Sequence, residues 1–207
     1  SLGLLVEEAR TNLMSHSTAP NTSNNYRIYG TPTYNDHTAP DGTLTATKIV
    51  GTGSGTGFDI YPNDYGYNQN SVQTFSVFVK NINATEIYLS LTTQGNGLRY
   101  NFSTNTTTLV GSGTTGVVQE YPNGWYKIST TLTKDNEYWY WLAFLDNFQN
   151  TTNSVYFWGV QLENGTFPTS YIPTSGSTVT RSADVASMTG TNFSSWYNQS
   201  EGSIFTV

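Results

Sequence analysis

Short segments in which hydrophobic and polar residues alternate recur along most of the chain. An alternation with a period of two is typical of a β-strand with one buried face, because successive side chains point to opposite faces of a sheet. Turn residues such as Gly, Asn and Pro separate these segments. The pattern predicts ten strands, over residues 44–50, 57–61, 72–80, 86–93, 98–103, 106–110, 116–121, 125–133, 137–145 and 154–163.

Helical periodicity is nearly absent, and the strand-favouring residues Thr, Tyr, Val and Phe are abundant. Asn-Gly pairs at 96–97, 123–124 and 164–165 predict tight turns, since both residue types accept the positive φ that such turns need. A propeller would show a repeat of roughly 40–45 residues, and the chain has no such repeat. We therefore expect an all-β fold, an antiparallel β-sandwich of the jelly-roll type.

The alternation is weaker at both ends, which predicts a division of the chain into four parts. Residues 1–10 are expected to be a linker from an upstream region, and 11–166 the sandwich, with an irregular stretch at 11–43. Residues 167–200, which contain several Pro, Gly and Ser, predict an extended strap or linker. Residues 201–207 are either the last strand of this domain or the start of a truncated following module.

The strand at 137–145 is hydrophobic on both faces. Tyr138 and Tyr140 share one face with Leu142, which is typical of an inward stripe, and this leaves Trp139 and Trp141 on the other face. Flat rings on an open sheet face could form a binding platform. The alternative is that both Trp side chains are core. Trp125 and Trp158, in contrast, are predicted to be buried.

Three further groups are candidate binding residues. In strand 98–103, Leu98, Tyr100 and Phe102 fit the core, whereas Arg99 and Asn101 point the other way and could bind hydroxyl groups. Strand 86–93 places Ile87, Leu89 and Leu91 inward and Tyr88 on the outer face. The alternative for both strands is an ordinary solvated face. A tyrosine-rich loop supplies the third group, Tyr61, Tyr65 and Tyr67.

The amino-acid composition limits the classes of ligand that this chain can bind. The chain has 30 aromatic residues (5 Trp, 15 Tyr and 10 Phe) but only 8 Lys and Arg, and its formal net charge is −6. Nucleic-acid binding needs a basic face, so this class of function is excluded, and an anionic membrane surface is disfavoured. Repulsion also disfavours heavily sulfated or uronate-rich ligands. The absence of cysteine excludes thiol catalysis and zinc fingers.

Catalysis is not expected. The two histidines, His16 and His37, both lie in the irregular N-terminal stretch, and no nucleophile or phosphate-binding motif is present. Glycoside hydrolysis needs two facing carboxylates, and nothing marks a pair among the acids at strand edges, Glu86, Glu120, Glu137 and Glu163. No cofactor is expected except a structural Ca²⁺, for which Asp59 with Asp64, or Asp135 with Asp146, could supply ligands.

Two terminal blocks carry a family resemblance. The first covers residues 3–13 (GLLVEEARTNL), and the second covers 158–163 (WGVQLE), 169–174 (TSYIPT) and 179–184 (VTRSAD). Between them lie 39–43, 75–80 and 124–127, which are generic to jelly rolls. In this order the blocks resemble a jelly-roll domain common in bacteriophage tail and fibre proteins. That domain in turn looks like the carbohydrate-binding modules of bacterial xylanases and glucanases.

The resemblance implies an accessory or adhesive role on a virion tail or outside the cell, and it transfers no ligand residues. We expect a non-catalytic module that binds polysaccharide or cell-surface glycan through surface aromatics, in a fibre that could be a homotrimer. The alternative is a purely structural spacer or oligomerisation domain that binds no sugar. Open aromatic faces would favour the first function and buried ones the second.

Overall fold

A computed structural model describes residues 5–18, 26–52, 57–60, 71–91, 96–133, 140–144 and 153–186, together with residues 191, 195, 197 and 198. The chain divides into two compact units. One comprises Arg10–Arg181, and the other comprises Ser1–Ala9 with Ser182–Val207. In the second unit, the backbone N–H of Glu7 donates to the Asp184 carboxylate and the N–H of Asp184 donates to the Glu7 carbonyl.

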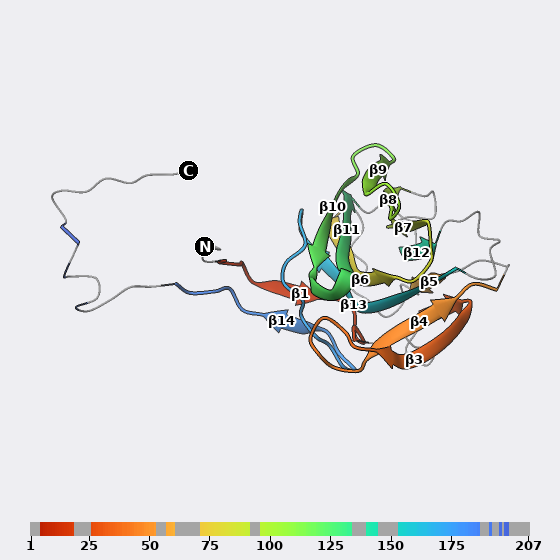
Figure 1. Cartoon of the computed structure of the whole chain (residues 1–207). Helices are drawn as coiled ribbons and strands as arrows, with labels where there is room; N and C mark the ends of the chain where they lie inside the picture. Colours follow the sequence, from red (N-terminus) through yellow and green to blue (C-terminus); the bar gives the residue numbers. More distant parts are fainter. Residues whose placement is uncertain are drawn as a thin grey trace. The chain divides into compact units, whose positions relative to one another are not determined.

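Fourteen strands, all paired in antiparallel fashion, form the described part of the larger unit (Figure 1). Sheet I has the order β10-β11-β6-β13-β4-β3, sheet II has the order β2-β5-β12-β7-β8-β9, and β1 pairs with β14. The strands are β1 (Arg10–Asn12), β2 (Tyr26–Tyr29), β3 (Thr31–His37), β4 (Ala46–Val50), β5 (Gly57–Ile60), β6 (Val72–Asn81), β7 (Glu86–Ser90), β8 (Gly97–Asn101), β9 (Thr106–Val110), β10 (Thr115–Tyr121), β11 (Trp125–Thr133), β12 (Tyr140–Phe144), β13 (Ser154–Asn164) and β14 (Val179–Arg181).

The predicted all-β antiparallel sandwich is confirmed, and each of the ten predicted strands is present, two of them (β9 and β11) with the predicted ends and the others with slightly different ends. The prediction that 11–43 is irregular is wrong for β2 and β3. β3 is an edge strand, and among the described strands it pairs with β4 alone. An edge strand tolerates Pro32 and the positive φ of Asn35, because one side of its backbone makes no ladder hydrogen bonds. Because Pro and Asn are typical of turns, the sequence pattern did not predict this strand.

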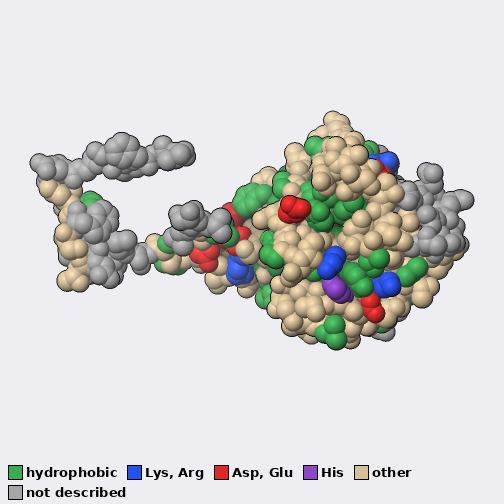
Figure 2. Space-filling view, viewed as in Figure 1, with side chains coloured by type: hydrophobic (Ala, Val, Ile, Leu, Met, Phe, Trp, Pro, Cys, Tyr) green, Lys and Arg blue, Asp and Glu red, His purple; other side chains and the backbone are tan. Residues whose placement is uncertain are grey.

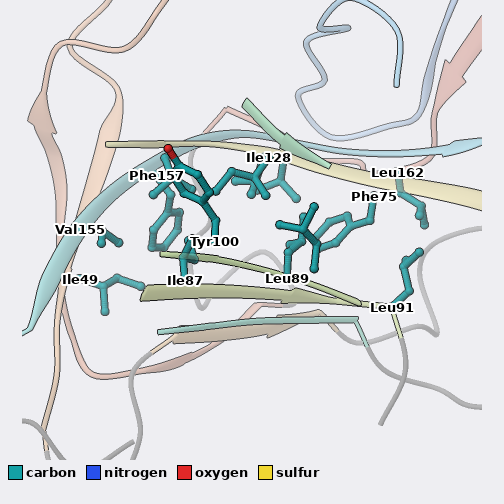
Figure 3. Close-up of a cluster of buried hydrophobic side chains, with 14 of the residues drawn as sticks. Ile49, Phe75, Ile87, Leu89, Leu91, Tyr100, Ile128, Val155, Phe157 and Leu162 are labelled. Carbon is teal, nitrogen blue, oxygen red and sulfur yellow. The ribbon is translucent and has the colours of Figure 1, made fainter. Parts of the chain in front are cut away.

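The main core lies between the two sheets (Figure 3). Phe75 and Leu162 of sheet I meet Leu89 of sheet II and Leu91 just beyond it. Leu98 and Tyr100 are buried in the same cluster, so the predicted inward faces of 86–93 and 98–103 are confirmed. Burial of many large apolar side chains is the dominant favourable term in folding, at roughly 1.5–3 kcal/mol for each one.

Sheet I has a second hydrophobic cluster on its other face. Phe78 alternates along β6 with the core residues Val77 and Val79, and it packs with Trp125 and Trp158. Both tryptophans are only 2% exposed, which confirms that they are buried. They nevertheless belong to this outer cluster and not to the core between the sheets. Ala39, Ala46, Tyr121, Tyr156 and Tyr171 complete it.

Part of the cover for this face comes from residues 169–176. Gln161 accepts a hydrogen bond from the Ile172 N–H (2.7 Å), and the Glu163 carboxylate accepts from the Thr169 N–H (3.1 Å) and from its hydroxyl. Tyr171 packs on Trp158 with ring centroids 4.4 Å apart. Buried Lys127 donates to the Thr169 carbonyl oxygen. Residues 169–176 therefore cover part of the second hydrophobic cluster.

No helix among the described residues is long and apolar enough to cross a membrane.

Candidate functional site

A pocket of about 500 Å³ opens beside the second cluster, on the outer face of sheet I. Its floor is formed by Lys80 of β6 and Trp125 of β11, which are register partners. One wall is the loop that follows β3, and the other is the turn between β10 and β11. The lining residues are His37, Thr38, Ala39, Pro40, Gly42, Lys80, Tyr121, Pro122, Asn123 and Trp125.

Both walls are tight turns whose shape follows from their residues. In the first, the Asp41 carboxylate accepts hydrogen bonds from the Thr43 N–H (2.9 Å) and hydroxyl (2.7 Å). Gly42 there has a φ of 86°, a conformation that glycine adopts without steric cost. In the second, Asn123 and Gly124 have φ values of 62° and 76°, as the Asn-Gly pair predicts. Local sequence therefore holds the pocket open.

His37 is fixed at the rim by two contacts. Its ring stacks on Tyr156 with centroids 4.4 Å apart and an interplanar angle of 16°. Its Nε2 atom accepts a hydrogen bond from the Lys80 ammonium (3.0 Å). Burial, followed by the charge of Lys80, lowers the pKa of His37, against an opposing effect of Asp36. His37 is therefore neutral at pH 7, and its proton resides on Nδ1.

Charge in the pocket is confined to one side chain. Lys80 is the only Lys, Arg, Asp or Glu among the lining residues, and the other groups are rings, prolines and neutral polar side chains. Figure 2 shows a histidine with basic and hydrophobic side chains around it, and an acidic side chain close by, on the face in view. Such a pocket can stack a ring-shaped ligand and donate hydrogen bonds to its oxygen atoms.

A smaller cleft of about 370 Å³ lies between β8–β9 and β10–β11. The hydroxyl of Tyr100 donates to Asn105 (3.1 Å), and that of Tyr126 donates to Glu120 (3.4 Å). Its phenol groups are therefore already engaged within the protein.

The predicted residues of sheet II fall into two groups. Tyr88 is 8% exposed, and the Arg99 guanidinium lies 5.0 Å from its ring centroid. Arg99 also forms an ion pair with Glu86 (3.8 Å). Asn101, in contrast, caps a turn, because its side-chain oxygen accepts from the N–H groups of Ser103 and Thr104. Arg99 and Tyr88 are thus brought together, whereas Asn101 has a structural partner of its own.

The other predicted ligand residues lie mostly outside the described residues. Trp141 belongs to β12, where its backbone is in register with Ser90 and Asp59. Trp139 and the loop residues Tyr61, Tyr65 and Tyr67 are not among the described residues, nor are the calcium candidates Asp64, Asp135 and Asp146. Within the described ranges, no three His, Asp or Glu side chains are grouped to hold a metal ion.

The acids considered for hydrolysis have separate roles. Glu86 pairs with Arg99, Glu120 accepts from Tyr126, and Glu163 is buried against Thr169. Glu137 lies outside the described residues.

Sequence reasoning missed this pocket, although its signal was present. The blocks 39–43, 75–80 and 124–127 supply Pro40, Lys80 and Trp125 to it. They lie far apart in the sequence, and the pairing of β6 with β11 is what brings Lys80 beside Trp125.

Comparison with known proteins gives few matches. No family model and no curated protein matches the sequence. Among solved structures, the chain is similar to the CBM22-1 xylan-binding domain of Xyn10C from Paenibacillus barcinonensis, with a TM-score of 0.46, 14% identity, and coverage of 76% of this chain and 97% of that one. It is also similar to the CBM22-1–GH10 modules of xylanase 10B from Clostridium thermocellum, complexed with xylohexaose, with a TM-score of 0.42, 10% identity, and coverage of 80% and 30%.

Proposed function

We propose that this chain is a non-catalytic module that binds a saccharide, and that the pocket beside His37 is its binding site. The observation that carries the proposal is the lining of the pocket. The rings of Tyr121, His37 and Trp125 and two prolines meet neutral hydrogen-bonding groups there. Sugars present flat C–H faces and rims of hydroxyls, so they need this combination of rings and polar atoms.

The absence of acids from the pocket lining supports a binding role and not a hydrolytic one. Enzymatic cleavage of a glycosidic bond by the common routes requires two carboxylates on either side of that bond. None of the ten lining residues is Asp or Glu. A sugar held there would meet only rings, neutral polar groups and Lys80.

Sheet II offers a second place for the same function. Arg99 is 43% exposed along its side chain and lies over Tyr88, next to the strand that contains Trp141. An Arg stacked on a ring presents a planar set of donors to hydroxyl groups. We keep this face as the alternative location, and variants can separate it from the pocket.

We also propose that the module belongs to a phage tail or fibre protein. This setting is supported by the terminal blocks 3–13 and 158–184 alone. The competing function is a spacer that binds no sugar. It is favoured by the structural use of those same blocks, in which Asn12, Gln161 and Glu163 all bond within the protein.

The test is affinity electrophoresis of the whole chain through gels that contain a panel of neutral and acidic polysaccharides. Thr38 is exposed and lines the pocket, so Thr38→Trp should fill the pocket without disturbing the core. Tyr121→Ala removes one ring. We expect both variants to lose retardation while Arg99→Ala retains it. Loss in Arg99→Ala alone would move the site to sheet II, and no retardation of the wild type by any polymer would favour the spacer.

A further inference from the structure

We propose that the saccharide bound in the pocket carries a carboxylate, as a uronic acid does, and that Lys80 is the residue that binds this group. The inference rests on the proposed function and specifies its ligand class.

Lys80 lies on the floor of the pocket. Its ammonium is the only charge that lines the pocket, and no acidic residue is among the lining side chains. Among the described residues, no Asp or Glu forms an ion pair with it, and its hydrogen-bond partner is the neutral ring of His37. An ammonium beside a solvent-accessible pocket and without an acidic partner can donate charge-assisted hydrogen bonds to an anion.

The Lys80 ammonium has donors to spare for a ligand. An ammonium has three N–H donors, and one of them is used by His37 Nε2 at 3.0 Å. His37 is held in place by its stack on Tyr156, so this bond also fixes the direction of the Lys80 side chain. Two donors remain, and a carboxylate with two oxygens can accept both. Hydrogen bonds between ionised partners are roughly twice as strong as neutral ones.

Other charged side chains lie near the pocket without lining it. Lys48 is the register partner of Tyr156, and Asp36 influences the pKa of both Tyr156 and His37, but neither Lys48 nor Asp36 lines the pocket. Lys127, also on this face, is buried and donates to the Thr169 carbonyl. Lys80 is therefore the side chain whose charge a ligand in the pocket would meet directly.

The local charge differs from the charge of the whole chain. The formal net charge of −6 made uronate-rich ligands seem unfavourable from the sequence. Repulsion between exposed charges is screened within about 8 Å at physiological salt, whereas a direct bond to Lys80 acts at contact. A carboxylate in the pocket would thus meet one ammonium at contact and the acids of the wider surface only through screening.

The experiment compares a polymer with its own neutral form. Polygalacturonic acid and the same polymer with its carboxyl groups reduced to alcohols are titrated into the full chain at 0.05 and 0.15 M salt. We expect the wild type to bind the acidic form about tenfold more tightly. Lys80→Met should abolish this preference, so that the two polymers bind with equal affinity, Lys80→Arg should keep part of the preference, and the matched control Lys48→Met should leave it unchanged.

Equal affinity of the wild type for both polymers, or an undiminished preference in a folded Lys80→Met variant, overturns the role of Lys80 and leaves the proposed function standing. Binding to neither polymer and to no other saccharide defeats both proposals. Inorganic phosphate is the competitor that separates two sources of anion. If it displaces the acidic polymer at a lower concentration than free galacturonate does, the pocket is a phosphate site and the carboxylate assignment is wrong.

Discussion

Asn12 shows how much one polar side chain of the terminal block contributes to the fold. It is completely buried, and its amide group reaches three parts of the chain. Its nitrogen donates to the carbonyls of Ile172 (2.8 Å) and Val160 (3.4 Å), and its oxygen accepts from the N–H groups of Met14 (3.0 Å) and Leu162 (3.2 Å). A buried amide with all its partners present stabilises one arrangement of these segments, because any other leaves polar groups unpaired.

We predict that Asn12→Ala destabilises the protein by about 3 kcal/mol or more. The substitution leaves two buried N–H groups without an acceptor, and each unsatisfied group costs about 1–3 kcal/mol. Urea unfolding followed by tryptophan fluorescence would measure the change. Thr108→Ala, at an exposed position on β9, is the matched control and should shift stability by less than about 0.5 kcal/mol. A small effect of Asn12→Ala would mean that the network is not needed for folding.

Single residues also show why the pocket was not predicted. Trp125 is buried, so a period-two reading assigns it to the core, and it gives no sign that it also lines a pocket. β6 is buried on both faces through most of its length, which removes the alternation that would distinguish the face of Phe78 and Lys80. His37 ends a strand that the sequence pattern did not reveal. The sequence shows the chemistry of each of these residues, but it does not show that they lie together in the fold.

At the scale of elements, the segment 169–176 behaves as part of the sandwich. Tyr171 connects it to the segment that follows β1 through a hydrogen bond between its hydroxyl and that of Ser17 (2.6 Å). Burial raises the pKa of Tyr171 to about 12. The neutral phenol is therefore the form that the folded state prefers.

We predict that the segment loosens at alkaline pH. Because the pKa is higher in the folded protein than in the unfolded chain, the stabilisation is complete below about pH 10 and is lost as the pH rises to about 12. The shift of about 2 units corresponds to roughly 2–3 kcal/mol. Unfolding free energies measured from pH 8 to 11.5 should fall less steeply for Tyr171→Phe than for the wild type. Parallel curves would show that Tyr171 does not titrate in this range.

The strands themselves were largely predictable, for a physical reason. β8 has one face in the core and one outside, so its side chains alternate, whereas β7 is also buried on its other face at Tyr88 and Ser90. The inward positions of both strands were assigned correctly. The turn between β10 and β11 was predictable from its Asn-Gly pair. β1 and β14 were missed because they are only three residues long and are held by side chains such as Asn12, not by a hydrophobic pattern.

At the scale of the whole molecule, sheet I carries two hydrophobic layers, one facing sheet II and one beneath residues 169–176. Removal of these residues would expose Trp158 and Phe78 to water. The compact unit that contains both layers runs from Arg10 to Arg181.

We predict that a fragment of residues 10–181 keeps the stability of the full chain, whereas a fragment of residues 11–166, the range that the sequence pattern suggests, does not fold stably. The shorter fragment lacks Ile172, one of the four hydrogen-bond partners of Asn12, and the cover of the second layer. Chemical denaturation and near-ultraviolet circular dichroism of both fragments would decide this. A cooperative transition of the shorter fragment at the midpoint of the full chain would contradict the prediction.

Arg10 and Arg181 are register partners in the β1–β14 pair. The polypeptide therefore enters and leaves the larger unit at neighbouring points, and strands paired in register have Cα atoms about 5 Å apart. Tension applied through these two ends would act on the hydrogen bonds between β1 and β14 and break them one after another. The sandwich itself would carry no load until this pair had separated. The same geometry would allow the unit to be grafted into a surface loop of another protein without stretching its host.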